Sequence, residues 1–447
     1  MNKLENISVK KLLVQLIIPS LVTAIVSGSY NLVDGIFIGQ TLGLEGNSAN
    51  TYTFMIYALV YAFSALASEG TASLLTISLG KKDYKNARLI LDSSIQVSLI
   101  LSILQSILLW FSLEGLLIIF GAPQELYHYV KEFCLTFLIG SPIYFVSHTL
   151  LYCLRAQGKI KEVLHINAIS FLVNAGTGAV LILVFHTGFF GSALSTVLAN
   201  LAALILTFRE YTGKSNDLKI DLKSLLFIDK KLINKIIAMG LPFFLTTVIS
   251  VILLILYNRV AFDYAGTYGI AALSITSSIY RYIISLMNAI TNGVQPVISF
   301  NYGAKNYSRI KQSLSISLII STIFSLCLFL VIQIFAAQIA TLFNSSDPKF
   351  IKFSSTALRL VMISLPVQGI INIGTNYFQY ISFSRISTFL VILRQIIFQI
   401  PLALFLPILF GITGLWSSYF ISDFLILVII MFWLKFMMTK LRKIMEA

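Results

Sequence analysis

Twelve long apolar runs constrain this chain more than any other feature of its sequence. Each is about 20 residues or longer, the length that an α-helix needs to cross the hydrocarbon core of a bilayer. The runs lie at residues 13–39, 51–79, 89–112, 126–153, 162–186, 190–208, 232–262, 268–300, 312–337, 352–380, 386–409 and 414–437. Since 57% of the 447 residues are hydrophobic and only 11% are charged, no soluble domain remains between the runs. We therefore predict an all-α membrane protein with twelve transmembrane helices.

The basic residues are distributed unevenly among the connections between these runs. If the N-terminus is cytoplasmic, the inward-facing segments contain 25 of the 32 lysine and arginine residues, and the outward-facing segments contain only Lys131, Lys349 and Lys352. This bias is the positive-inside rule. We therefore expect a multi-pass protein of the cell membrane with both termini in the cytoplasm. The net charge of +14 then reflects orientation in the lipid bilayer, and no nucleic-acid partner is expected.

The two halves of the chain resemble each other at a constant offset of 223 residues. The positions that coincide are Gly70 with Gly293, Gly80 with Gly303, Lys82 with Lys305, Tyr84 with Tyr307, Pro19 with Pro242, Gly188 with Gly411 and Gly191 with Gly414. With one residue of slip, Lys161 also meets Arg385. We therefore predict two pseudo-symmetric six-helix bundles, formed by residues 1–208 and 232–447, joined by a cytoplasmic amphipathic linker at 209–231.

A parallel pair of six-helix bundles is typical of secondary transporters, because the cleft between the bundles can open first to one side and then to the other. A duplication that is retained only for stability, as in some channels, is the alternative interpretation. We favour alternating access, with the cleft as the path of a small substrate.

Polar residues at helical spacing mark one face of several helices in the second half. The eighth run places Ser274, Ser278, Arg281, Ser285, Asn288, Asn292, Gln295 and Ser299 on one side of a helix. The tenth run adds Gln368, Asn372, Asn376 and Gln379, and the eleventh adds Arg394, Gln395 and Gln399. Buried packing contacts could explain the serines, but an arginine in the membrane interior requires water or a partner. We expect these faces, together with Asp423 of the twelfth run, to line a substrate cavity, in which Arg281 and Arg394 would favour an anion. Pairing of either arginine with Asp423 or with backbone carbonyls is the alternative.

The first half has its polar faces on the first two helices. The first run carries Ser20, Thr23, Ser27, Tyr30 and Asp34 on one side with Asn31 beside them, and the second carries Tyr57, Tyr61, Ser64 and Ser68 next to Glu69. An ionised carboxylate in the membrane interior is costly, so Asp34 and Glu69 are candidates to bind and release protons. The tyrosines and acids suit an organic cation. A structural acid bonded to a neighbouring hydroxyl is the alternative for each, and also for Asp423 in the twelfth run.

Several kinds of chemistry have no matching motif in the sequence. There is no Gly-rich phosphate-binding loop, so no nucleotide site is expected. The four histidines have no metal-ligand spacing, and no nucleophile–base arrangement is evident. We therefore expect no cofactor, no metal site and no enzymatic activity, and we expect the protein to be a monomer. A channel would need a filter-like loop and a membrane-embedded transferase would need an acidic or histidine cluster, and neither is found.

Three motifs resemble those of the MATE (multidrug and toxic compound extrusion) transporters, within the superfamily that also contains oligosaccharidyl-lipid and polysaccharide exporters. They are Tyr30-Asn-Leu-Val-Asp34-Gly-Ile-Phe-Ile-Gly39-Gln40, Gly293-Val-Gln295-Pro296-Val-Ile-Ser-Phe-Asn301-Tyr302-Gly303-Ala304-Lys305 and Leu393-Arg394-Gln395. The resemblance implies ion-driven multidrug efflux, in which amphipathic organic compounds and other xenobiotics leave the cell. It also implies that Asp34 takes part in proton or sodium coupling.

The chain departs from the family pattern at one place. Family members often carry an Asn-x-x-x-Asp motif in the fifth helix, where this chain has Asn174 but a glycine at position 178. One carboxylate fewer weakens a sodium site, because hard cations prefer several anionic or carbonyl oxygens. We therefore predict an antiporter with Asp34 as proton carrier, assisted by Asn174 and Glu69. A lipid-linked oligosaccharide flippase, or another lipid flippase of the same superfamily, is the alternative.

Overall fold

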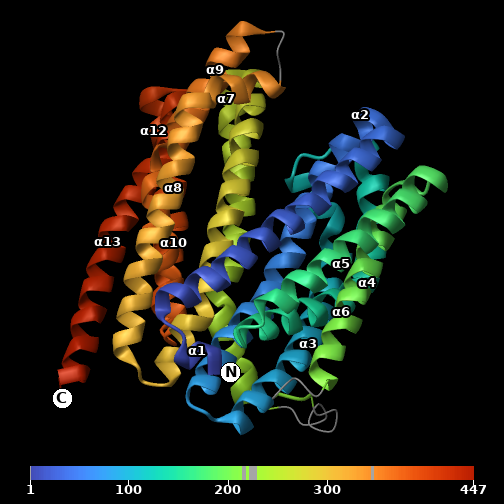
Figure 1. The fold of residues 1–447 in the computed structure, drawn as a ribbon. Coiled ribbons are helices and arrows are strands. Elements are labelled where there is room, and N and C mark those ends of the chain that lie inside the picture. Colours follow the sequence, from blue (N-terminus) through green and yellow to red (C-terminus); the bar gives the residue numbers. More distant parts are fainter. Residues whose placement is uncertain (1, 214–217, 221–228, 344–346, 447) are drawn as a thin grey trace. The chain divides into compact units, whose positions relative to one another are not determined.

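The computed structural model describes residues 2–213, 218–220, 229–343 and 347–446 (Figure 1). In these ranges all regular secondary structure is helical. The elements are α1 (Asn2–Asn6), α2 (Val9–Gly80), α3 (Tyr84–Ile119), η1 (Gln124–Leu126), α4 (Tyr127–Ala156), α5 (Ile160–Gly178), η2 (Ala179–Val184), α6 (Gly188–Thr212), α7 (Lys230–Gly303), α8 (Tyr307–Phe343), α9 (Pro348–Val361), η4 (Met362–Ser364), α10 (Leu365–Tyr380), α11 (Ser384–Ile392), η5 (Leu393–Gln399), α12 (Ile400–Phe410) and α13 (Ile412–Glu446).

The described residues contain eleven helical segments that are long and apolar enough to cross a membrane. One of them, α7, is broken at Gly266 and supplies two spans, so the predicted all-α architecture with twelve transmembrane helices is confirmed. Large apolar side chains remain exposed on these helices, including Phe111 at 84% and Leu342 at 85%. Such surfaces are stable in contact with lipid rather than water.

Glycine kinks replace two of the loops that the sequence predicts. Helix α2 continues from the first predicted span into the second and changes direction at Gly43, where φ is 61°. Helix α7 does the same at Gly266, where φ is 55°. An L-residue with a side chain avoids this left-handed backbone, whereas glycine adopts it without steric cost. The kinks thus let consecutive spans follow each other with almost no connecting loop.

The internal repeat is visible in the backbone as well as in the sequence. Gly43 and Gly266 are 223 residues apart, which is the offset found from the sequence. The same offset relates Lys82 and Lys305, with φ of 59° and 57°, and Gly188 and Gly411, with φ of 54° and 59°. Unusual backbone conformations therefore recur at matching points of the two halves.

The chain forms two compact units. Unit 1 contains Met1–Asn6 and Ile18–Thr247. Within it, α4 packs against α3 and α6, and α6 packs against α5 (Figure 1). Its core lies around the aromatic side chains of Phe133, Phe137, Tyr144 and Phe145, all on α4.

Unit 2 contains Ile7–Ile17 and Val248–Ala447. In it, α8 packs against α9 and α10, while α13 packs against α10 and α12 (Figure 1). Trp416 on α13 is buried against Phe353 of α9, with ring centroids 5.0 Å apart. The predicted linker at 209–231 is described only at 209–213, 218–220 and 229–231, so its amphipathic part lies largely outside the described residues.

The first turns of the two kinked helices belong to the unit formed mainly by the other half of the chain. Residues 7–17, which include the start of α2 at Val9, group with unit 2, and residues 230–247 of α7 group with unit 1. A Cβ atom on Gly70 would lie 2.0 Å from the carbonyl oxygen of Ile236, and one on Gly293 would lie 2.8 Å from Cα of Ile17. Small residues at helix crossings permit this close backbone approach. Each half thus contributes the start of one kinked helix to the other unit, and in both units a glycine allows the close backbone contact.

Candidate functional site

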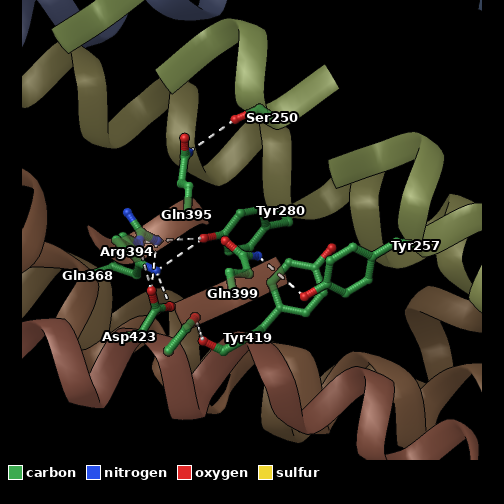
Figure 2. Close-up of polar contacts among 10 residues, drawn as sticks. Ser250, Tyr257, Tyr280, Gln368, Arg394, Gln395, Gln399, Tyr419 and Asp423 are labelled. Carbon is green, nitrogen blue, oxygen red and sulfur yellow. Dashed lines mark hydrogen bonds and ion pairs between the residues drawn. The ribbon is translucent and has the colours of Figure 1, made fainter. Parts of the chain in front are cut away.

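A buried network of charged and polar side chains lies in unit 2 around Arg394 (Figure 2). Nε of Arg394 donates to Oδ1 of Asp423 on α13 at 2.8 Å. Nε2 of Gln368 on α10 donates to the other carboxylate oxygen of Asp423 at 2.6 Å. Asp423 is only 1% exposed, so its charge is balanced by the guanidinium group rather than by bulk water.

Tyr280 on α7 joins this network from the opposite side. Its hydroxyl group accepts hydrogen bonds from Nη2 of Arg394 at 3.3 Å and from Nε2 of Gln368 at 3.1 Å. Arg394 itself lies in the π-helical segment η5, together with Gln395 and Gln399. The wider turn of a π-helix is often found at functional sites. Here it brings three long polar side chains to one short stretch of backbone.

A second group of hydroxyls continues the network. Tyr257 on α7 and Ser418 on α13 share a hydrogen bond of 2.5 Å, and Nε2 of Gln399 donates to the Tyr257 hydroxyl at 3.4 Å. The ring of Tyr419 lies between those of Tyr257 and Tyr280, with centroid distances of 4.6 and 5.7 Å (Figure 2). Gln395 donates to Ser250 at 3.3 Å. Helices α7, α10, η5 and α13 thus all contribute to one polar interior.

The network corrects one expectation from the sequence. Arg394 was predicted to be an uncompensated cation in a cavity, but the nearby carboxylate of Asp423 neutralises it. Pairing of Arg394 with Asp423 was the alternative that the sequence left open, and the structure supports that alternative. Tyr257, Tyr280 and Tyr419 were missed because aromatic residues in a span usually signal packing, and their hydroxyls gave no separate periodic pattern.

The remaining predicted residues of unit 2 lie on α7 and α10. Nδ2 of Asn372 donates to Oδ1 of Asn288 at 3.1 Å, so the polar faces of α7 and α10 meet at this point. Nη2 of Arg281 donates to Ser278 on its own helix at 3.0 Å, and Arg281 is exposed. Asn292 is half-buried, whereas Gln295 and Gln379 are fully buried. Their role as cavity residues stays a prediction.

Asp34 and Asn174 share a polar neighbourhood in unit 1. Ser192 on α6 donates to Oδ2 of Asp34 at 3.4 Å. Nδ2 of Asn174 donates to Ser195 and Thr196 of the same helix, also at 3.4 Å. The other oxygen of Asp34 is buried and has no hydrogen-bond partner among the described residues. Helix α6 was not singled out by the sequence because its hydroxyl residues are small and can be buried in any helix contact.

Glu69 lies elsewhere in unit 1, in an ion pair with Arg155. Nη2 of Arg155 is 3.4 Å from Oε2 of Glu69, and both side chains are buried. The guanidinium carbon of Arg155 lies 3.7 Å above the ring centre of Tyr152. Arg155 is one of the 25 basic residues that we assigned to the inward-facing segments, but it lies within the last turn of α4, which continues to Ala156.

The predicted polar face of the second span meets α4. The ring of Tyr57 lies 6.0 Å from that of Tyr144, and the ring of Tyr61 lies 5.6 Å from His148. Ser64 and Nδ1 of His148 share a hydrogen bond of 2.9 Å. The side chains of Tyr30 and Asn31 lie outside what the structure describes. In the described part of the chain, no three His, Cys, Asp or Glu side chains are grouped to hold a metal ion.

Comparison with known proteins gives a consistent result over nearly the whole length. The model of the MatE family matches the chain twice, at residues 19–180 and 240–405, once in each half. The multidrug export protein MepA of Staphylococcus haemolyticus is 26% identical over 419 residues, which cover 92% of this chain and 90% of that protein. MepA of Staphylococcus aureus strain MRSA252 is 24% identical, with 92% and 91% covered.

Solved structures show the same fold. One is the outward-facing conformation of a multidrug resistance MATE family transporter of the MOP superfamily, with a TM-score of 0.91, 22% identity and 98% of both chains covered. Another is a MOP superfamily transporter from Pyrococcus furiosus, with a TM-score of 0.91, 23% identity and the same coverage. Its description reports a binding pocket of reversed polarity.

Proposed function

Since the chain belongs to the MatE family, we propose that it exports amphipathic organic compounds across the cell membrane in exchange for protons. Members of this family are membrane transporters and not enzymes. The proposed mechanism is alternating access of the two halves, with both termini in the cytoplasm and a single chain as the working unit. The relatives that match most of the chain are multidrug export proteins. This supports a range of organic substrates rather than one dedicated solute.

The side chains around Asp34 are the observation that favours a proton over sodium as the coupling ion. Asp34 accepts a hydrogen bond from Ser192, and the nearby partners of Asn174 are the hydroxyls of Ser195 and Thr196. Position 178, one helical turn after Asn174, is a glycine. One carboxylate with hydroxyl neighbours can bind a proton, whereas a sodium site needs more anionic or carbonyl oxygens. The position of an acid in a largely apolar bundle also favours its neutral form when the site is dry.

Transport in proteoliposomes with separately imposed gradients tests this function. We expect uphill movement of an amphipathic dye when a proton gradient is imposed, and none when only a sodium gradient is imposed. Asp34→Asn should abolish the uphill movement while the protein stays folded in the membrane. Asp263→Asn is the matched control, because Asp263 is an exposed acid beside the kink of α7.

Three outcomes would contradict parts of the proposal. Uphill export by Asp34→Asn at the rate of the unmodified protein would remove Asp34 as the carrier. Export driven by sodium alone would replace the coupling ion. Movement of a labelled lipid-linked oligosaccharide, without movement of any dye, would identify the chain as a flippase instead.

A further inference from the structure

Two stripes of polar and aromatic side chains face each other inside unit 1. On α2 they are Tyr57, Tyr61, Ser64 and Glu69, and on α4 they are Tyr144, His148, Tyr152 and Arg155. The α4 residues are separated by four, four and three positions, which places them on one side of that helix. Between Tyr57 and Glu69 the α2 stripe extends roughly 18 Å along the helix.

The contacts between the stripes are continuous. At one end the rings of Tyr57 and Tyr144 lie 6.0 Å apart and their hydroxyls interact, and Tyr57 is the member of the stripes on which the carboxylate of Asp34 acts electrostatically. The ring of His148 stacks on that of Tyr144 with centroids 5.4 Å apart, and Nδ1 of His148 shares the 2.9 Å hydrogen bond with Ser64. These groups continue the polar path from Asp34 into the core of the unit.

The other end of the path is the ion pair. The hydroxyl of Tyr61 interacts with that of Tyr152, and the Tyr152 hydroxyl interacts with the carboxylate of Glu69. Arg155 closes the series with its 3.4 Å contact to Glu69. Arg155 lies in the last turn of α4, directly before the turn at Gln157 that connects α4 to α5. In the proposed orientation this turn is on the cytoplasmic side.

Stability alone gives a poor account of this pair. Glu69 is 2% exposed and Arg155 is 6% exposed. Taking two charges out of water costs several kcal/mol per ion, and well-packed apolar residues are often at least as stabilising as a buried ion pair. The pair lies at one end of a row of hydroxyl groups. Its position is better explained if the carboxylate of Glu69 has to gain and lose a proton during the transport cycle.

We propose that the two stripes form a proton exit path, in which a proton released by Asp34 passes along the hydroxyls and His148 to Glu69 and then to cytoplasmic water. Glu69 accepts the proton on its carboxylate and becomes neutral. Arg155 and Tyr152 favour the ionised carboxylate that follows, so that the proton leaves and the path is reset. Glu69 is thus the second acid of the coupling reaction, and Tyr152 is a positioning residue for it.

This inference rests on the proposed proton coupling, and its test separates the two. Purified protein is reconstituted into vesicles that contain a pH-sensitive dye, and proton movement is measured while an amphipathic substrate is exchanged. Substrate counterflow at equal pH on both sides is measured in parallel, because it requires the transport cycle but no net proton movement. Glu69→Gln and Tyr152→Phe are compared with Tyr211→Phe, a buried tyrosine of α6 that bonds to Gln157 and Leu150 outside the path.

We expect Glu69→Gln and Tyr152→Phe to slow proton movement by about 100-fold, the lower end of the range for a positioned proton-transfer group. Counterflow and thermal stability should change little, Glu69→Asp should restore part of the proton movement, and Tyr211→Phe should behave as the unmodified protein. Unchanged proton movement in Glu69→Gln would overturn the path and leave Asp34 as carrier. Equal losses of proton movement and counterflow would make the pair structural and also overturn the path. Absence of proton movement in the unmodified protein would instead refute the proposed function.

Discussion

Half-buried Arg394 and buried Asp423 form an ion pair in unit 2, and the residues at the matching positions of the first half are both neutral. Asp423 corresponds to Asn200 at the offset of 223, and Arg394 corresponds to Ser170 at the offset of 224 that relates Lys161 and Arg385. The Glu69–Arg155 pair of unit 1 likewise has no charged counterparts, since the matching residues are Asn292 and Gln379. Each half therefore contains a charge pair at positions that carry neutral residues in the other half.

The first prediction concerns the stability of the Arg394–Asp423 pair. Removing one partner from a buried ion pair leaves the other charge uncompensated, which costs about 3–5 kcal/mol. We therefore expect Arg394→Gln and Asp423→Asn each to lower the thermal midpoint of the detergent-solubilised protein strongly. The double variant should be destabilised by less than the sum of the two single effects, because it contains no unpaired charge. Additive effects in this double-mutant cycle would show that the two residues do not depend on each other.

A second prediction concerns the glycines at the helix crossings. A Cβ atom on Gly70 would collide with backbone atoms of Ile236, and one on Gly293 with those of Ile17. Gly70→Ala and Gly293→Ala should each destabilise the protein by about 1–3 kcal/mol, the usual cost of overpacking. Gly115→Ala is the matched control, since a Cβ atom there meets nothing within 4 Å. Equal midpoints for all three variants, measured by thermal unfolding, would refute the close crossing.

The third prediction is a pH dependence at the start of α9. Asp347 caps this helix by accepting hydrogen bonds from the backbone N–H groups of Lys349 and Phe350, and it also accepts one from the hydroxyl of Tyr268. The Tyr268 hydrogen bond, followed by the one from Phe350, lowers the pKa of the Asp347 carboxyl group below its ordinary value of 3.8. Since the pKa is lower in the folded protein, the stabilisation is fully present above the ordinary pKa and is lost as the pH falls through the lowered pKa.

Thermal unfolding at different pH values measures this effect. Asp347→Ala should unfold at a lower temperature than the unmodified protein near neutral pH, and the difference should shrink once the pH falls below the ordinary pKa of an aspartate. Asp347→Asn retains an oxygen acceptor for the cap but has no charge to titrate. At neutral pH its thermal midpoint should therefore fall by less than that of Asp347→Ala. A difference that stays constant down to strongly acidic pH would show that the carboxylate charge has no part in the cap.

The architecture was predictable because it depends on features that repeat along the chain. Spans of about 20 apolar residues and a constant offset of 223 define the helices and their duplication without any knowledge of contacts. The replacement of loops by kinks was less accessible. Gly43 and Gly266 look like ordinary loop residues in sequence, and only the structure shows that helix lies on both sides of each glycine and that the break is confined to a residue of positive φ.

The polar interior was predictable only in part, for a different physical reason. Helical spacing located the faces that carry Tyr57, Asn288 and Gln368, because each face is a property of one helix. Partners across helices depend on the packing of distant segments, so Arg155 opposite Glu69 was not evident, and Asp423 was only one of the possible partners of Arg394. A buried ion pair is recognised only when both partners are seen together.

The final prediction concerns the orientation of the chain in the membrane. Helix α3 begins next to Lys85 and ends at Ile119, shortly before Glu125, so these two exposed positions lie at opposite ends of one span. Lysines concentrate at the first end, which the positive-inside rule places in the cytoplasm. In a Cys327→Ser background, which removes the exposed native cysteine and leaves Cys134 and Cys153 buried, Lys85→Cys should react with a membrane-impermeant maleimide only after cell lysis. Glu125→Cys should react in intact cells. Labelling in the reverse order would invert the topology, and the proposed exit path at Glu69 would then lead to the outside.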